Sequence, residues 1–294
     1  MAVYSIKDLE TLSGIKAHTI RIWEKRYSLI EPHRTTTNIR YYTDCELKKI
    51  LNVAVLNNHG IKISNIAKLN DSELKDEIMR VSDANPDLDH AIDSLLIAMI
   101  DIDEIRFSSI IAKSVSKKGF KDTLVEVIYP FLNRIGVMWQ AGDVNPVQEH
   151  FVSNLIRQKI IAAVDGISNG FRKDAQSFLL FLPEGEWHEI GLLFASYLIK
   201  EAGHKLIYLG QSVPYSDVLA TGATNHVDHL LLGGTTSQVE FNFINYLKDL
   251  GSAFPDKKIL FFTRFKVDDS GQLQKNLHHL TSVPDLVEYL EKLG

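Results

Sequence analysis

The sequence predicts a multidomain chain with three parts: a small α-helical head with a two-stranded wing, a four-helix bundle, and an α/β half built on a parallel sheet. Three observations predict this order. Short helical patterns and one β-prone stretch occupy residues 1–70. Sustained helical periodicity then runs to about residue 167. From residue 177 onward, apolar segments alternate with helical patterns, which is typical of a parallel sheet covered by helices.

The composition is that of an ordinary globular protein, with 45% hydrophobic and 23% charged residues. A chain of 294 residues has room for two or three domains. No apolar run approaches the roughly 18 residues of a membrane span, and we expect neither a span nor a secretory signal. Cys45 is the sole cysteine, which excludes an intrachain disulfide or a thiolate metal cluster and favours the cytoplasm.

Charge is unevenly distributed along the chain. Residues 1–70 carry 11 Lys and Arg against six Asp and Glu, whereas the whole chain has a formal net charge of −5. A basic head on an acidic body suggests that the head meets a polyanion.

The head begins with two short helices. In "YSIKDLETLSGIKAHTIRIWEKRYSLI", Ser5 can cap the first helix, and Gly14 marks the turn that ends it. The second helix runs from about Lys16 to Tyr27, because Ile20 and Trp23 follow at helical spacing.

A wing and two more helices complete the head. A polar tip at Thr36–Asn38 and the β-prone Ile39–Tyr42 predict a two-stranded wing. Asp44 can then cap a helix over Cys45–Asn57, and Ile61–Leu69 predicts one more short helix.

The head carries a recognisable pattern. The segments "IRIWEKRYSLIEPHR" and "IRYYTDCEL" contain R-x-W-x-x-R-Y, a Pro, an Arg, then R-Y and an Asp before a helix, in that order. This stretch resembles the winged helix-turn-helix head of the MerR family of transcriptional regulators. That family usually has a glycine in the wing just before R-Y, whereas the tip here reads Thr-Asn. The resemblance implies double-stranded operator DNA as a partner.

The residue types of the head suit that partner. His18, Thr19 and Arg21 stand near the start of the second helix, where a recognition helix meets base edges. A second set suits phosphate contacts, which supply affinity without sequence information: Lys25, Arg26, Arg34 and Arg40. Tyr41 can pack on the DNA backbone or complete the small core. The alternative is that these basic residues form a solvated helix face.

The middle of the chain predicts helices only. Residues 71–86 are expected to form an exposed linker helix, and residues 87–170 a bundle. Breaks at Ile102–Asp103, Gly119 and Gly142–Pro146 divide the bundle segment into four helices. Their short connections favour antiparallel neighbours and hence a four-helix bundle.

Residues 176–294 predict a Rossmann-like half. The segments "SFLLFLP", "KLIYLG", "DHLLLGG" and "KKILFFT" are expected to be buried strands, with helices between them and at the C-terminal end. Ligands of such sheets bind beyond the carboxyl ends of the strands. His188 lies there, just after the first strand.

The loop around His188 carries a motif. Glu186, His188 and Gly191 form E-x-H-x-x-G, which at this place in an α/β half resembles the cobalamin-binding module. In that module the histidine is the lower axial ligand of cobalt, and the neighbouring acid orients its second nitrogen. The resemblance implies that His188 binds the metal if the ligand is cobalamin, with Glu186 behind it. Gly191 would let the helix start close to the ligand.

The bundle supplies a second motif. Trp139 is followed, after nine residues, by Glu149 and His150. This spacing resembles the W-x9-E-H motif of light-responsive, cobalamin-binding regulators of the MerR type, where it covers the upper face of the corrin and its adenosyl group. The resemblance implies one flat ligand that contacts Trp139, His150 and His188.

The sequence departs from the pattern of the cobalamin-binding regulators at three places, and these differences affect the choice of ligand. Gln140 stands where the light-sensing regulators have a histidine that takes the upper cobalt position after photolysis. The third strand ends near Gly233 and Thr235, in place of an S-x-L whose hydroxyl helps to hold the cobalamin tail. The fourth strand ends in Phe262 and Thr263, in place of the Gly-Gly that gives the tail's nucleotide base room.

We therefore predict a DNA-binding transcriptional regulator, in the first instance a repressor, controlled by a tetrapyrrole chromophore and hence by light. The ligand is either cobalamin, as adenosylcobalamin, or a tail-less tetrapyrrole such as biliverdin, bound non-covalently. Its state would change the self-association of the chain into dimers or tetramers. The alternatives are a corrinoid carrier of a methyltransferase system and a regulator with an empty sensor half. We expect no catalytic residues, because the sequence offers no nucleophile–base pair.

Overall fold

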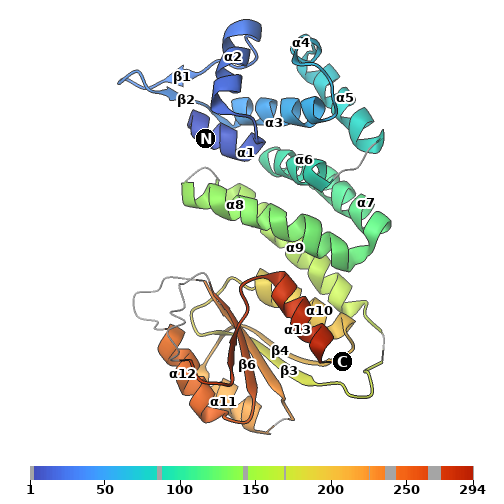
Figure 1. Cartoon of the computed structure of the whole chain (residues 1–294), viewed down its shortest axis with the longest axis vertical. Helices are drawn as coiled ribbons and strands as arrows, with labels where there is room; N and C mark the ends of the chain where they lie inside the picture. The colour runs from blue at the N-terminus through green and yellow to red at the C-terminus, as the bar shows by residue number, and fades with distance from the viewer. Residues whose placement is uncertain are drawn as a thin grey trace. The chain divides into compact units, whose positions relative to one another are not determined.

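The computed structural model describes residues 3–84, 88–141, 145–168, 170–224, 226–235, 243–263 and 273–293. The chain forms two compact units, Met1–Leu155 and Ile156–Gly294. The first unit is helical apart from its wing, and the second is a sheet with helices on both faces (Figure 1). The finer division into domains stays a prediction. Within the described ranges, no helix has the length and apolarity that a membrane crossing requires.

The first two helices form as predicted. They are α1 (Ile6–Ser13) and α2 (Ala17–Tyr27). Ser5 caps α1, because its hydroxyl accepts a hydrogen bond from the N–H of Asp8 and its own N–H donates to the Asp8 carboxylate. Gly14 ends the helix with a φ of 71°, a left-handed conformation that glycine adopts without strain and that redirects the chain into α2.

The wing consists of β1 (His33–Arg34) and β2 (Arg40–Tyr41), paired antiparallel. Asn38 at its tip has a φ of 64°, and asparagine tolerates this left-handed region better than most residues. The Asn38 side chain also accepts a hydrogen bond from Arg34 Nη1 at 2.7 Å. Asn38 therefore makes a tight turn without the glycine that the MerR pattern has near this place.

The next helix, α3 (Asp44–Asn58), is the centre of the head and is buried over most of its length. Its N-cap is Thr43, and the prediction that Asp44 caps it was wrong. The Glu46 carboxylate accepts the Thr43 N–H at 2.7 Å, which forms a capping box. Asp44 is engaged elsewhere, since its carboxylate accepts the hydroxyl of Tyr4 at 2.8 Å.

A series of helices follows the head. They are α4 (Ile63–Ile66), α5 (Asp71–Ala84), α6 (Leu88–Ile100), α7 (Glu104–Thr123), a π-helical turn (Leu124–Ile128), α8 (Tyr129–Ala141) and α9 (Pro146–Asp165). The predicted breaks at Ile102 and Gly119 are confirmed, because both residues leave the helical conformation with φ values of 53° and 84°. The third break lies between α8 and α9, and residues 142–144 are outside the described ranges. The π-helical turn was not predicted.

Apolar and charged contacts join α6, α7 and α8 within the first unit. The rings of Phe107 and Phe131 lie 5.7 Å apart between α7 and α8. Arg134 on α8 donates to the buried carboxylate of Asp93 on α6 at 2.7 Å. This arrangement agrees with the predicted helical region.

The sheet of the second unit contains β3 (Ser177–Pro183), β4 (Lys205–Val213), β5 (His229–Gly234), β6 (Lys258–Thr263) and β7 (Leu277–His279). The strands are all parallel, in the order β4-β3-β5-β6-β7. The first four strands were predicted, whereas the short edge strand β7 was not. Chain order reverses between β3 and β5, and α/β sheets bind ligands at such a switch point.

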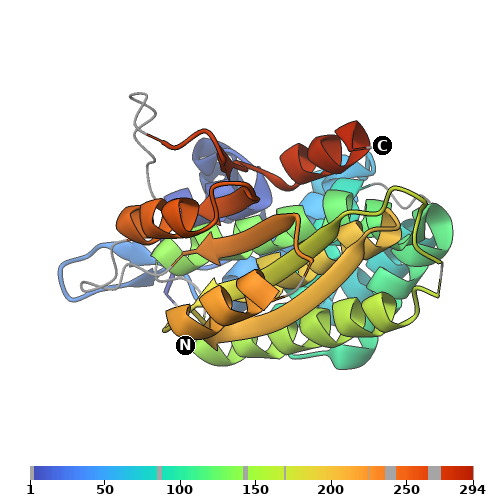
Figure 2. The same cartoon turned by 90° about the horizontal axis from the view of Figure 1, so that it is seen from below.

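Helices cover both faces of the sheet (Figures 1 and 2). On one face lie α10 (Ile190–Glu201) and α13 (Val283–Lys292), and on the other α11 (Tyr215–Thr224) and α12 (Phe243–Ala253). Alternate strand residues such as Phe181 form an apolar core with α11 and α12. The remaining strand positions face α10, whose N-cap is Glu189, the residue after His188.

Candidate functional site

The loop that follows β3 holds His188 in a fixed orientation. Glu186 is 5% exposed, and its Oε1 lies 2.7 Å from His188 Nδ1. The same oxygen accepts the backbone N–H groups of Trp187 and His188, each at 3.0 Å. In the neutral imidazole this bond assigns the proton to Nδ1 and the lone pair to Nε2, which is the form that binds a metal. The His188 side chain itself is 67% exposed.

Glu186 also ties this loop to the two neighbouring strands. Its Oε2 accepts the N–H of Thr235 at 2.7 Å and the Thr235 hydroxyl at 3.1 Å, just after β5. Its carbonyl accepts the N–H of Ser212 on β4 at 3.1 Å. The carboxyl ends of three adjacent strands therefore meet at one buried residue, and His188 stands at the switch point of the sheet.

A second buried carboxylate fixes the start of α10. Glu189 accepts a hydrogen bond from Arg157 Nε of α9 and another from the hydroxyl of Tyr208, 3.1 Å from its Oε2. Burial, with Glu189 beside it, raises the pKa of Tyr208 above its usual range. Arg157 and Tyr208 were missed from the sequence, because neither belongs to a motif and only the fold brings them to Glu189.

The ring of Phe262 lies against two glycines of the predicted site. A Cβ atom added at Gly233 would lie 2.3 Å from Phe262 Cε2, and one added at Gly191 would lie 3.1 Å from it. Gly233 is the register partner of Phe262 across β5 and β6, and Gly234 is that of Thr263. The half-buried ring of Phe262 therefore occupies the space that side chains at Gly191 and Gly233 would need.

The other half of the predicted site belongs to the first unit. His150 Nδ1 lies 3.1 Å from Glu149 Oε2, and Ser153 donates to Glu149 Oε1 at 2.8 Å. The His150 side chain is 74% exposed. The backbones of Trp139 and Gln140 lie in α8, but their side chains are outside the described part of the structure. That these residues and His188 contact one ligand stays a prediction.

The geometry of the second unit fits a corrinoid only in part. His188 with Glu186 behind it suits an axial metal ligand, since the macrocycle supplies the remaining nitrogens. Phe262, in contrast, fills the space between Gly191 and Gly233 where the resemblance expects the nucleotide tail. In the described residues, no three His, Cys, Asp or Glu side chains form a group that could hold a metal. The His188–Glu186 pair therefore fits the corrin ring with its metal, whereas the space at Phe262 does not fit the nucleotide tail of cobalamin.

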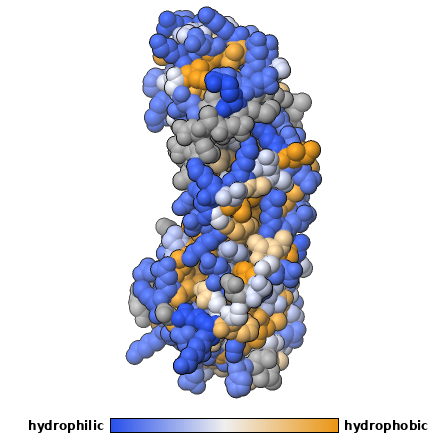
Figure 3. Space-filling model, turned by 90° about the vertical axis from the view of Figure 1, so that its right-hand side faces the viewer, coloured by the Kyte–Doolittle hydropathy of each residue, from blue (hydrophilic) through white to orange (hydrophobic). Residues whose placement is uncertain are grey.

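The predicted DNA-binding residues lie on α2 and the wing, within one unit. The exposed ones are His18, Arg21, Lys25, Arg26, Arg34 and Arg40, whereas Thr19 and Tyr41 are half-buried. Tyr41 stacks on His33, with the ring centres 5.3 Å apart. Trp23 is buried in the core of the head. In the view of Figure 3, the surface of the head is mostly hydrophilic.

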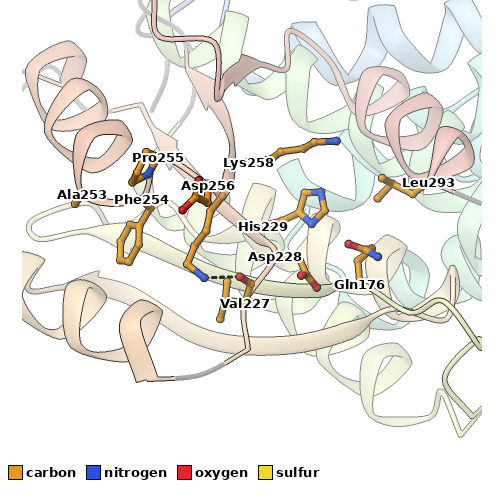
Figure 4. Close-up of a pocket in the computed structure, with 11 residues that line it drawn as sticks. Gln176, Val227, Asp228, His229, Ala253, Phe254, Pro255, Asp256, Lys258 and Leu293 are labelled. Carbon is orange, nitrogen blue, oxygen red and sulfur yellow. Dashed lines mark hydrogen bonds between the residues drawn. The ribbon is translucent and has the colours of Figure 1, made fainter.

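A pocket of about 400 Å³ lies at the opposite, amino ends of the strands (Figure 4). None of the predicted ligand residues lines it. His229, which does, is 2% exposed, stacks on Phe178 at 4.4 Å and lies 2.9 Å from the Tyr289 hydroxyl through Nε2. Burial, helped by the positive charge of Lys258, lowers the pKa of His229 to about 4. A buried histidine with a lowered pKa makes the stability of this region depend on pH.

Two protein families match the chain. Residues 4–73 match the MerR HTH family regulatory proteins, and residues 91–163 match the B12 binding domain. The chain thus combines a MerR-type helix-turn-helix head with a B12 binding domain. The parallel sheet begins at Ser177, after the matched residues, and completes the predicted fold class.

Two similar proteins match most of the chain. The chain is 28% identical over 258 residues to the HTH-type transcriptional repressor CarH of Myxococcus xanthus, which covers 86% of this chain and 85% of that protein. It is 24% identical over 246 residues to the HTH-type transcriptional repressor CarA of the same organism. This match covers 83% of this chain and 81% of CarA. Both relatives are transcriptional regulators.

A solved structure has a similar fold. The monomethylamine corrinoid protein of Methanosarcina barkeri superposes with a TM-score of 0.56 at 13% identity. The match covers 71% of this chain and all of that one. At this identity the likeness concerns the fold alone.

Proposed function

We propose that the chain is a transcriptional regulator that binds operator DNA through α2 and the wing and senses a tetrapyrrole through its other half. The observation that carries this proposal is the buried Glu186, which holds His188 at the switch point of a sheet in a chain that also has a MerR-type head. The similarity to CarH and CarA supports repression as the sign of regulation.

The ligand is a cobalamin or a tail-less tetrapyrrole such as biliverdin, and we propose that it makes the protein respond to light. The B12 binding domain and the His188–Glu186 pair support a corrinoid. Gln140 and Phe262 support the tail-less alternative. A ligand can change self-association only through different affinities for the two states, so its light-induced change would have to alter a contact between subunits. The MerR-type head argues against a corrinoid carrier of a methyltransferase.

The sensor half is tested by offering cobalamin, biliverdin and haem separately to the purified full chain. We expect one of them to bind and to acquire a shifted visible spectrum, and His188→Ala to abolish or shift that absorption. His226→Ala is the control, because His226 is an exposed histidine of the same unit. Size-exclusion chromatography of the loaded protein in darkness and after illumination tests the change in association.

Two different results would contradict the proposed role of His188 and the proposed sensor. Identical affinity and spectrum in His188→Ala would assign His188 a purely structural role. A chain that binds none of the three compounds would have no tetrapyrrole sensor.

The DNA-binding half is tested on promoter fragments at several salt concentrations. Arg21→Ala removes a base-edge contact and should weaken binding by about 1–3 kcal/mol on the preferred sequence. Arg40→Ala removes a phosphate contact, so it should weaken binding on every sequence and lower the slope of log K against log salt by about 1. Fluorescence anisotropy measures both effects.

Lys173→Ala is the control for the DNA measurement, since Lys173 is an exposed lysine of the second unit. If binding were insensitive to salt and to both head variants, the head would not be the DNA-binding surface.

A further inference from the structure

The contact between Phe262, Gly233 and Gly191 determines what can lie beside His188. Gly191 lies in the first turn of α10, three residues after His188, and Gly233 is the second-last residue of β5. Both backbones meet the same aromatic ring, at the distances given above. The ring therefore lies against both β5 and the first turn of α10, the helix that follows the His188 loop.

The position of this ring follows from strand register. Gly233 pairs with Phe262, and Leu231 pairs with Leu260 two residues earlier, so these residues share one face of the sheet. A glycine beside an aromatic residue on a neighbouring strand lets the ring lie flat across the glycine backbone. The ring also reaches Gly191 because α10 covers that face. The placement is thus built into two strands and one helix.

Free cobalamin carries its own lower axial ligand, the base at the end of its nucleotide tail. His188 can take that position only if the nucleotide leaves it and lies elsewhere. The adjacent space for the displaced nucleotide would be a groove between Gly233 of β5 and Gly191 of α10. Non-bonded carbon atoms need about 3.5–4.0 Å between them, and the ring of Phe262 already lies in this space. No second ring fits between Phe262 and these glycines.

We propose that Phe262 is a specificity-determining residue that closes this groove, so that the sensor accepts tetrapyrroles without a nucleotide tail. The proposal rests on the proposed tetrapyrrole function and refines its ligand class. Two kinds of compound share the required chemistry: a linear bilin, and a corrinoid from which the nucleotide has been removed.

The test compares cobinamide, which has the corrin ring and cobalt but no nucleotide, with hydroxocobalamin and with biliverdin. Each is titrated into the ligand-free full chain and followed by visible absorption. We expect the wild type to bind cobinamide or biliverdin at least about tenfold more tightly than cobalamin. Phe262→Gly should gain cobalamin binding by a similar factor, and Phe262→Leu, which keeps an apolar plug, should not.

Phe171→Gly is the matched control, because it makes the same substitution at an exposed phenylalanine of the same unit. Far-UV circular dichroism checks that Phe262→Gly remains folded, and Phe262→Ala serves as the milder variant if it does not. A spectral shift that also requires His188 confirms that cobalamin enters the intended site.

The outcomes separate this inference from the proposed function. If the wild type binds cobalamin as tightly as cobinamide or biliverdin, Phe262 does not exclude the tail, while the sensor function stands. If Phe262→Gly and Phe262→Ala gain no cobalamin binding although the wild type binds cobinamide or biliverdin, the selectivity has another origin and the inference is overturned. If the opened variants bind cobalamin but the wild type binds neither cobinamide nor biliverdin, Phe262 closes the groove without leaving a site for tail-less tetrapyrroles, and the inference is overturned. If no compound binds to any variant, both proposals fall.

Discussion

Glu186→Ala is expected to lower the free energy of unfolding of the second unit by about 3–4 kcal/mol, because hydrogen bonds to charged groups contribute about 1.5–3 kcal/mol each and a buried donor left without an acceptor costs about 1–3 kcal/mol. The carboxylate accepts backbone N–H groups of Trp187, His188 and Thr235, and alanine offers none of them an acceptor. The effect should be large because these donors come from two separate segments of the chain.

Native-state hydrogen exchange of the amides in β3 and β5 is the measurement, since the slowest of them report opening of the second unit alone. Glu184→Ala is the matched control: the same substitution, two residues earlier in the same loop, at an exposed side chain. It should change stability by no more than about 0.5 kcal/mol. If Glu186→Ala and Glu184→Ala had the same free energy of unfolding, the hydrogen bonds of Glu186 would contribute nothing to the joining of the strands.

The second unit is also expected to lose about 3 kcal/mol of stability as the pH falls from 7 to 4, through His229. Its pKa is lowered to about 4 in the folded protein by burial and by Lys258, whereas an unfolded histidine titrates near 6.5. Between these values the unfolded chain binds more protons than the folded one, so stability decreases with falling pH. The contribution is complete above about pH 6.5 and is lost as the pH approaches 4. His204 and His278 are shifted in the same direction by burial.

Urea unfolding at several pH values, followed by circular dichroism, checks this expectation. His229→Gln should be less stable than the wild type at pH 7, because it loses the stacking on Phe178, but its stability should depend less on pH. His226→Gln replaces an exposed histidine three residues earlier and should keep the wild-type pH profile. Parallel pH profiles for His229→Gln and the wild type would rule out His229 as the source.

The architecture could be predicted because its signals are local. Caps, helical periodicity and buried apolar strands place most elements, and the chain order of strands and helices then requires a parallel sheet. The edge strand β7 escaped prediction because three residues carry no periodicity. The cap of α3 was assigned to Asp44 because aspartate is a common N-cap, but Tyr4, far away in the sequence, binds that carboxylate.

The site was predictable only where a motif marks it. Glu186 and His188 stand two residues apart, so their pairing follows from the sequence. The hydrogen bond from Thr235 to Glu186 and the contact of Phe262 with Gly191 join residues far apart in the chain, and they depend on the register of the folded sheet. The hydrogen bonds from Arg157 and Tyr208 to Glu189 likewise join residues far apart in the chain.

The hydrogen bonds to Glu186 have a consequence for the entropy of binding. A loop that must become ordered around a ligand loses conformational freedom at that moment, and the affinity decreases accordingly. Here Trp187, His188 and Thr235 are held by one carboxylate of the chain itself. The imidazole is therefore preorganised, and a ligand that meets it should bind with little ordering of this loop. Loss of the ligand should equally leave the loop in place, so a structural signal would have to begin in another part of the chain.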